Sequence, residues 1–381
     1  MDGMAAPLAH PFADDFVGDL AEHAAAVDRA GSFPWDSLNA LHSQGLLAAT
    51  ARTQDGGQEI GLSRAIDLVR SAGRGCASTA LIFTMQLIHL RVSARSAWPE
   101  HLRAQIGRSA GRFGTLINAL RVEPALGSPS RGGMPATIAR RTSEGWSISG
   151  RKIYSTGAPG LGWMIVFAST EEAVPRMGQF LVGAHTPGVR IEESWDQLGL
   201  RASGSHDVIF DDVVVPFDHA VDLRPPSDWS ARDDEGAAWN ALLIGSLYTG
   251  VAEASRDWII EFLRNRVPAN LGAPLATLPR MQEAVGRVET LLAANRRMIA
   301  SMASDVDAGR VPAAAESGLI KTVASANAIE AVQAAVELAG THALARANPL
   351  ERHLRDVLCA RIHAPQPDAA YTLAGRIALG Q

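Results

Sequence analysis

The spacing of the hydrophobic residues changes twice along this chain of 381 residues, and the two changes limit the folds that it can adopt. Up to about residue 111, apolar residues recur at intervals of three and four, which is typical of amphipathic helices. From residue 112 to about 222, short runs of apolar residues lie between glycines and prolines, as in strands. From residue 232 the helical spacing returns in long alanine-rich stretches. This order of helices, strands and helices predicts an α+β protein with several domains.

The three sections predict three domains. We expect an N-terminal α-helical domain at residues 1–111, a middle small β-barrel or sandwich at residues 112–222, and a C-terminal four-helix bundle at residues 232–381. Inside the middle section, apolar and polar residues alternate on either side of Gly150 and Arg151. This pattern predicts two strands of a hairpin, residues 146–150 and 152–156, that turns at the Gly-Arg pair.

The composition excludes several classes of partner. A net charge of −5 without a polybasic stretch argues against nucleic acid and against an anionic membrane. The two cysteines, Cys76 and Cys359, are too few for a disulfide framework and suit a reducing compartment. The first twenty residues lack the basic and continuous apolar regions of a signal peptide, and the apolar run at 239–251 is too short to span a bilayer. We therefore expect a cytoplasmic protein.

Three motifs of the middle section stand in a fixed order. Residues 122–128 read Val-Glu-Pro-Ala-Leu-Gly-Ser, and residues 150–157 read Gly-Arg-Lys-Ile-Tyr-Ser-Thr-Gly. The third motif, at 195–206, contains Leu-Gly-Leu-Arg and precedes the strand pattern at 210–216. In order and spacing these motifs resemble those of the acyl-CoA dehydrogenase superfamily, and the similarity covers nearly the whole chain. The resemblance implies that superfamily's fold and a flavin cofactor.

In that superfamily the first two motifs lie along the flavin. By this resemblance Val122 and Ser128 lie at the pyrimidine edge, with Val122 standing where the superfamily has threonine. Tyr154 replaces a tryptophan that backs the isoalloxazine, and Ser155 and Thr156 stand close to flavin N5, where hydrogen bonds tune reactivity. All five are therefore candidate cofactor contacts. A surface turn and a plain β-hairpin are the purely structural alternatives.

A second group of candidate cofactor contacts lies in the C-terminal section. Arg266 matches an arginine that reaches the flavin phosphates across the subunit boundary, and Glu337 and Gly340 match a motif on the adenine side. Pro279 and Glu337 stand where the superfamily has glutamines, so the resemblance implies a flavin, FAD or FMN, that is bound less permanently. The alternative for Arg266 is a solvated cation at a helix end.

The catalytic base of the dehydrogenases is missing. Those enzymes take the substrate α-proton with a glutamate at one of two positions, which hold Ala364 and Asn240 here. Residues that grip CoA in many of them are replaced by Ala238 and Ala241. A positioned base contributes about 10²–10⁴-fold to such a reaction, and an alanine supplies none of it.

Two histidines are the candidates for catalysis instead. His363 stands beside Ala364 and resembles a histidine near the flavin in the superfamily's monooxygenases, such as the dibenzothiophene monooxygenase and amine N-hydroxylase types. An imidazole titrates near neutral pH, so it could take or relay a proton. His89 resembles a second active-site histidine of those enzymes. A packing or helix-end role stays open for His363, and a core role stays open for His89.

Three functions follow as hypotheses. The first is a monooxygenase that uses O₂ and reduced flavin, delivered by a separate flavin reductase, on a small aromatic, heteroaromatic or amine substrate. The second is an FAD-dependent acyl-CoA dehydrogenase or oxidase with a relocated base, for which Glu123 and Glu337 are candidates. The third is a non-catalytic relative that keeps the fold. The sequence has no HExxH, paired CxxC or Walker motif, so no metal site is predicted.

The resemblance also implies an assembly. We expect a homotetramer, built as a dimer of dimers, in which Arg266 reaches the flavin of the neighbouring subunit. The alanine-rich helices predicted at 280–305 and 311–338 carry apolar residues on more than one face, as a second buried side requires.

Overall fold

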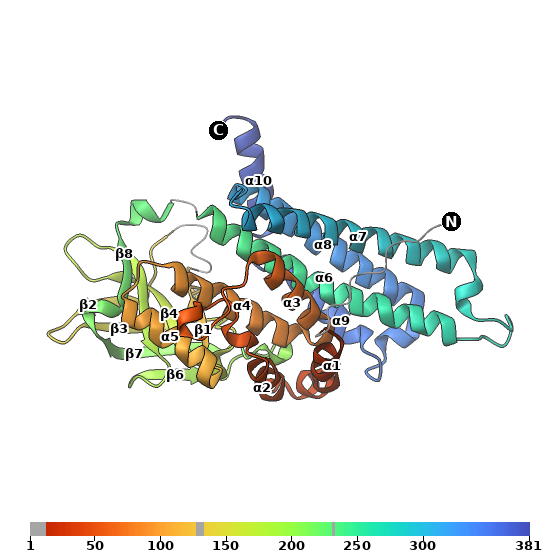
Figure 1. Cartoon of the computed structure of the whole chain (residues 1–381), viewed down its shortest axis with the longest axis horizontal. Helices are drawn as coiled ribbons and strands as arrows, with labels where there is room; N and C mark the ends of the chain where they lie inside the picture. The colour runs from red at the N-terminus through yellow and green to blue at the C-terminus, as the bar shows by residue number, and fades with distance from the viewer. Residues whose placement is uncertain (1–12, 127–132, 231–232) are drawn as a thin grey trace.

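The computed structural model describes residues 13–126, 133–230 and 233–381, which form helices, then a sheet, then longer helices. Figure 1 shows the sheet at one end of the molecule and the long C-terminal helices at the other, with the N-terminal helices packed along both. The predicted order and the α+β fold class are therefore confirmed.

The N-terminal part is built around one buried helix. Its described helices are α1 Ala13–Ala30, α2 Trp35–Ser43, α3 Leu62–Gly75, α4 Ala77–Arg95 and α5 Glu100–Phe113. Helix α4 is buried on most sides because it packs against α3, α5, α6 and β1. Helix α2 ends at Ser43, since Gly45 shortly after it adopts a left-handed conformation with φ 71°.

The middle part is a single sheet. Its strands are β1 Leu116–Leu120, β2 Ile138–Arg141, β3 Trp146–Lys152, β4 Leu161–Thr170, β5 Met177–Gly183, β6 Val189–Glu192, β7 Asp207–Val215 and β8 Ala220–Arg224. The strand order is β6-β7-β3-β2-β4-β5-β8, and β1 pairs with β4 in parallel. Strand β4 is almost continuously apolar and buried, as expected for a central strand.

The hairpin predicted at Gly150 and Arg151 is wrong. Strand β3 runs through both residues and pairs with β7. Gly150 lies where the register against β7 shifts, and a Cβ atom added there would lie 2.7 Å from Cα of Thr137. Because glycine in a strand also marks a bulge or a close backbone approach, this signal was misread as a turn.

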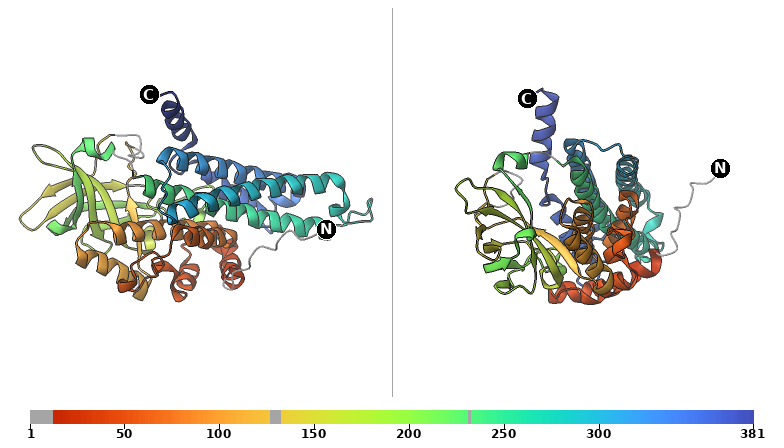
Figure 2. Two further views of the ribbon diagram at one scale, coloured as in Figure 1. Left: turned by 45° about the horizontal axis from the view of Figure 1, so that its top comes forward. Right: turned by 60° about the vertical axis from the view of Figure 1, so that its left-hand side comes forward.

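The C-terminal part contains α6 Asp234–Asn265, α7 Pro279–Asp307, α8 Ala314–Ala339, α9 Leu350–Leu358 and α10 Pro367–Ala378. Helices α6, α7 and α8 pack side by side, and α9 packs against α6 and α8. Helix α10, which the sequence did not suggest, projects away from the body in both views of Figure 2.

One large hydrophobic core joins the three parts. Buried residues of α1 to α4, of the sheet and of α6 to α8 belong to the same cluster. In the part of the chain that the structure describes, no helix combines the length and the apolar character of a membrane span.

Candidate functional site

The segment that follows β3 carries three of the candidate flavin contacts. Tyr154 is 56% exposed, has φ 56°, and meets the edge of Trp195 at 6.2 Å between ring centroids. Ser155 is buried, and its hydroxyl has no hydrogen-bond partner among the described residues. Thr156 Oγ1 lies 3.0 Å from Ser205 Oγ. An exposed aromatic ring on a strained backbone, next to an unpaired buried hydroxyl, fits a bound isoalloxazine.

The Val122 loop lies directly beside this segment. The backbone N–H of Ile153 donates to the carbonyl of Val122 at 2.9 Å. The structure therefore brings Val122 together with residues 154–156, as expected if both line one cofactor. Ser128, the remaining candidate of this group, lies outside the described residues.

A buried ion pair next to Val122 stabilises the Val122 loop. Lys152 Nζ donates to Glu123 Oε1 at 2.6 Å, and both side chains are at most 2% exposed. Glu123 also accepts from the N–H groups of Ala136 and Thr137 and from the Thr137 hydroxyl. Desolvation alone would raise the pKa of Glu123, but these partners hold that pKa below its ordinary value. The oxygens of Glu123 are engaged, which argues against Glu123 as a relocated base.

His363 lies in the segment after α9, against two long helices. Its Nε2 is 2.7 Å from the hydroxyl of Tyr248 on α6, and its carbonyl accepts from Lys321 Nζ on α8 at 2.6 Å. The side-chain amide of Asn240, also on α6, donates to the carbonyl of Ala364 at 2.9 Å. The two positions at which the superfamily has its glutamate base are thus in direct contact, and they hold an amide and a methyl group.

The surroundings keep His363 neutral. Burial, followed by the charge of Lys321, lowers the pKa of His363 to about 4. The near-neutral titration suggested by the free imidazole is therefore absent, because the charged form loses its hydration next to another cation. Tyr248 and Lys321 were not recognised from the sequence. The one available signal was a lysine inside the alanine-rich stretch that became α8.

His89 lies on α4, and Arg121 is close to it. Burial and then the charge of Arg121 lower the pKa of His89 to about 3. Arg121 follows β1 and directly precedes Val122, so His89 neighbours the candidate flavin loop. The guanidinium carbon lies 6.0 Å from the ring centroid of Phe167, and no carboxylate of the described residues forms an ion pair with it. His89 therefore stays a candidate through its position and not through basicity.

The Arg-Asp motif near the end of the chain joins the three parts. Arg355 forms a two-pronged ion pair with Asp28 of α1, at 2.6 and 3.0 Å, and donates to the carbonyl of Leu198. The neighbouring Asp356 is buried and accepts from the N–H of Leu200 at 2.7 Å. Burial raises the pKa of Asp356 to about 6. The motif is thus architectural, and it fixes where α9 and the His363 segment lie.

The second group of candidate cofactor contacts lies far from this region. Arg266 directly follows α6, Glu337 is in the last turn of α8, and Gly340 follows that helix; all three are exposed. Figure 1 shows this end of the bundle on the side opposite to the sheet. Within one chain these residues do not share a site with the Tyr154 segment, so a cofactor contact from them requires a second subunit.

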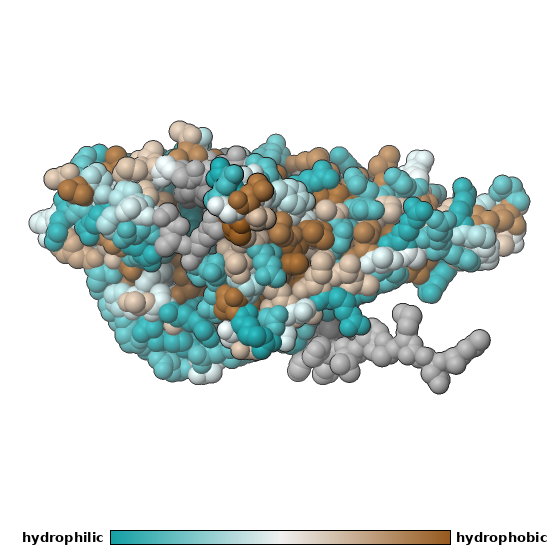
Figure 3. Space-filling model, turned by 90° about the horizontal axis from the view of Figure 1, so that it is seen from above, coloured by the Kyte–Doolittle hydropathy of each residue, from teal (hydrophilic) through white to brown (hydrophobic). Residues whose placement is uncertain are grey.

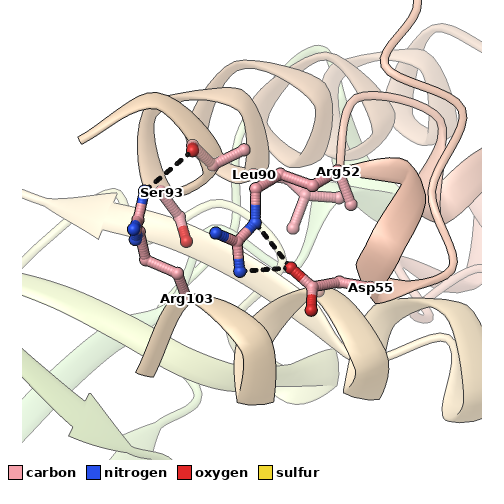
Figure 4. A pocket seen from close by; sticks show the side chains of 8 residues that line it. Arg52, Asp55, Leu90, Ser93 and Arg103 are labelled. Atoms are coloured by element: carbon pink, nitrogen blue, oxygen red, sulfur yellow. Dashed lines mark hydrogen bonds and ion pairs between the residues drawn. The ribbon is translucent and has the colours of Figure 1, made fainter. Parts of the chain in front are cut away.

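A small crevice elsewhere in the structure is lined by charged side chains, two of which pair with each other. Figure 4 shows Arg52, Asp55, Leu90, Ser93 and Arg103 around it, and it involves α4, α5 and the turn Thr53–Asp55. Arg52 Nε donates to buried Asp55 at 2.6 Å. None of the candidate catalytic or cofactor residues lines this crevice. Arg52 also pairs with Glu100 of α5 at 2.8 Å, so its ion pairs connect this turn to that helix.

The fold is that of a flavin-dependent oxidoreductase. Three domain models carry the description acyl-CoA dehydrogenase: the N-terminal domain matches residues 9–93, the middle domain 122–213 and the C-terminal domain 242–366. The chain therefore belongs to the acyl-CoA dehydrogenase family, and its cofactor is a flavin.

The similar proteins include acyl-CoA dehydrogenases and a protein solved with FMN and an amino sugar nucleotide. The protein YdbM of Bacillus subtilis, named as an acyl-CoA dehydrogenase, is 31% identical over 362 residues, 94% of this chain and 92% of its own. The mitochondrial short-chain specific acyl-CoA dehydrogenase of Bos taurus is 27% identical, over 94% of this chain and 87% of its own. A structure of KijD3 in complex with FMN and dTDP-3-amino-2,3,6-trideoxy-4-keto-3-methyl-D-glucose is 27% identical. Its TM-score is 0.82, and the match covers 96% of this chain and 91% of that one.

Proposed function

We propose that this protein is a flavin-dependent monooxygenase, which uses reduced flavin and O₂ on a small aromatic, heteroaromatic or amine substrate. The observation that carries the proposal is the hydrogen bond from Asn240 to the carbonyl of Ala364. It joins the two positions of the family's glutamate base, and neither residue can take an α-proton from a thioester. A dehydrogenase would lack the proton acceptor that its reaction requires.

The two acids considered for a relocated base are poorly suited to the role. Glu123 is fully buried in its ion pair with Lys152. Glu337 is exposed on the last turn of α8, at the end of the bundle that lies away from the sheet. Ala238 and Ala241, which replace the residues that grip CoA, are buried in the core. These features favour the monooxygenase over the acyl-CoA dehydrogenase.

The residues that would hold the flavin are those of the Val122 loop and of the segment that follows β3. Val122, Tyr154, Ser155 and Thr156 of one subunit would contact the isoalloxazine, and Arg266, Glu337 and Gly340 of a neighbour would contact the remote end. When bound in reduced form, the flavin would supply the two electrons for oxygen activation. The exposed adenine-side residues suit a flavin that a separate reductase delivers. KijD3, solved with FMN and an amino sugar nucleotide, supports an amine among the substrates.

His363 and His89 are the candidate catalytic residues. Both imidazoles are neutral at pH 7, because burial lowers their pKa values to about 4 and about 3. A neutral imidazole next to the cofactor can donate or accept a hydrogen bond without adding charge. We therefore assign them hydrogen bonding to the reacting groups instead of strong-base chemistry.

The acyl-CoA dehydrogenase remains the second candidate, because YdbM and the bovine short-chain enzyme carry that name. One experiment separates the two. The protein is mixed anaerobically with reduced FMN or FAD and then with O₂ in a stopped-flow spectrometer. A transient flavin absorbance, distinct from those of the oxidised and reduced forms, is expected for the monooxygenase. Bleaching of oxidised bound flavin by an acyl-CoA, without added reductant, would establish the dehydrogenase and overturn the proposal.

We also propose a homotetramer built as a dimer of dimers. Members of this family are typically oligomeric. Helix α10 buries little of its own surface in one chain. Three large apolar residues in or directly after this helix are each more than half exposed: Tyr371, Ile377 and Leu379. Figure 3, seen from the side on which α10 projects, shows further hydrophobic residues at the surface of the bundle. A second subunit would cover such a surface. Light scattering that gives a monomer mass would contradict this assembly.

A further inference from the structure

The segment that carries His363 is held by one buried cation. Lys321 is 1% exposed, and its ammonium donates to the carbonyls of Ala360 at 3.0 Å, His363 at 2.6 Å and Pro365 at 3.2 Å. An ammonium has three N–H donors, and each has an acceptor here. Burial of a lone charge is costly, and charge-assisted hydrogen bonds of this kind offset that cost. Lys321 thus fixes the backbone on both sides of His363.

The hydroxyl of Tyr248 decides which nitrogen of His363 carries the proton. Tyr248 is fully buried, and among the described residues its hydroxyl has one hydrogen-bond partner, His363 Nε2 at 2.7 Å. If Nε2 carried the proton, it would donate to the tyrosine oxygen, and the buried O–H would be left without an acceptor. Such an unmade hydrogen bond costs about 1–3 kcal/mol. The O–H therefore donates to Nε2, and the proton of the neutral ring sits on Nδ1.

The doubly protonated ring is disfavoured by the same surroundings. In an imidazolium, Nε2 would carry a proton and donate it to the oxygen of Tyr248. The O–H of Tyr248 would then again be left without an acceptor. It would also place a second positive charge beside the ammonium of Lys321, whose charge lowers the pKa of His363 further below the value that burial alone produces. Two independent groups, one from α6 and one from α8, thus favour the same protonation state.

We propose that Tyr248 and Lys321 are positioning residues that hold His363 as the neutral Nδ1–H tautomer. His363 then offers a hydrogen-bond donor to an acceptor atom of the flavin or the substrate, because no described residue accepts from Nδ1. This proposal rests on the proposed function for the identity of the acceptor. The tautomer itself is a property of the chain and can be measured without turnover.

The test is solid-state NMR on the full-length protein with ¹³C,¹⁵N-labelled histidine, with and without added FMN. A ¹³C–¹⁵N correlation distinguishes Nδ1, which is bonded to Cγ, from Nε2, which is not. His363→Gln identifies the signal of His363 among the 11 histidines. At pH 7 we expect a protonated Nδ1 and an unprotonated Nε2. A protonated Nε2 in the wild-type protein would overturn the proposal, whatever the oxygen assay shows.

Two variants separate the roles of the positioning residues. Tyr248→Phe removes only the hydroxyl, so the Nε2 signal should shift and a population of the Nε2–H tautomer should appear; an unchanged spectrum would overturn the role of Tyr248.

Lys321→Met removes the ammonium, and titration of the His363 signal should give a higher pKa, while Lys321→Arg should restore most of the effect. Glu330→Met is the matched control, because it removes an exposed charge from the same helix and should leave the pKa unchanged. Equal pKa values in Lys321→Met and Glu330→Met would refute the role of Lys321. If Lys321→Met does not fold, the tautomer of His363 in the wild-type protein and in Tyr248→Phe still decides the proposal.

Discussion

The buried pair of Lys152 and Glu123 gives the sharpest test of how the Val122 loop and the segment after β3 are held together. Removing one member of a buried ion pair leaves an uncompensated charge and costs about 3–5 kcal/mol. The two removals are not equivalent. Lys152→Met leaves a carboxylate that still accepts three hydrogen bonds, at 2.6, 3.0 and 2.6 Å. Glu123→Gln leaves the ammonium facing a neutral amide and turns an NH₂ group toward the N–H of Ala136 or Thr137. We expect Glu123→Gln at the upper end of that range and Lys152→Met at the lower end.

The assay is urea denaturation, in which the midpoint of the transition that includes the β-domain is compared between variants. Arg287→Met is the matched control, because it breaks an exposed pair with Glu283 and should change stability by less than about 1 kcal/mol. The double variant Glu123→Gln/Lys152→Met should lose less than the sum of the single losses, since no lone charge remains. Single variants as stable as Arg287→Met would refute this reasoning. A Glu123→Gln protein that is fully stable but inactive would instead identify Glu123 as a relocated base.

Three further outcomes are expected from other residues. His363→Ala should lower turnover and leave flavin affinity and assembly nearly unchanged, because the imidazole acts in the chemical steps; full activity across pH 6 to 8 would contradict its catalytic role. Arg266→Ala should mainly raise the flavin dissociation constant in a fluorescence titration, and an unchanged constant would refute its phosphate contact. Burial lowers the pKa of His353 to about 3, so the unfolded chain binds more protons than the folded one below about pH 6.5. Stability should therefore fall as pH drops from 6.5 toward 3, by up to about 1.4 kcal/mol per pH unit. His353→Gln should show a shallower fall in its urea midpoint, and an identical fall would rule out this histidine as a contributor.

The sequence predicted what depends on local spacing. The long helices α6, α7 and α8 and the order of the three parts follow from periodicity, which each segment carries by itself. Helix α10 was not predicted, although Pro367 occupies its first turn, where proline is favoured. Gly150 was misread because a bulge and a turn use the same residue for different reasons.

The candidate site likewise has residues that the sequence could identify and residues that it could not. Tyr154, Ser155 and Thr156 are adjacent in the chain, so a motif could identify them together. Tyr248 and Lys321 are separated from His363 by 115 and 42 residues, and their hydrogen bonds exist only once α6, α8 and the last segment have packed. One signal was nevertheless present. The chain has only two lysines, Lys152 and Lys321, and both are buried. In a protein whose surface cations are arginines, a lysine indicates an interior site.

The ion pair between Arg355 and Asp28 has a consequence for how the protein is made. Its two residues are 327 positions apart, and Asp356 next to it anchors the loop at Leu200. On the ribosome, the N-terminal helices emerge first, and Asp28 has no partner until Arg355 has been synthesised. A message cut short before codon 355 would yield a chain whose first helix and β-domain loop both lack their anchor. Helix α9 thus anchors the first helix and the β-domain loop together, and neither contact can form before this helix has been synthesised.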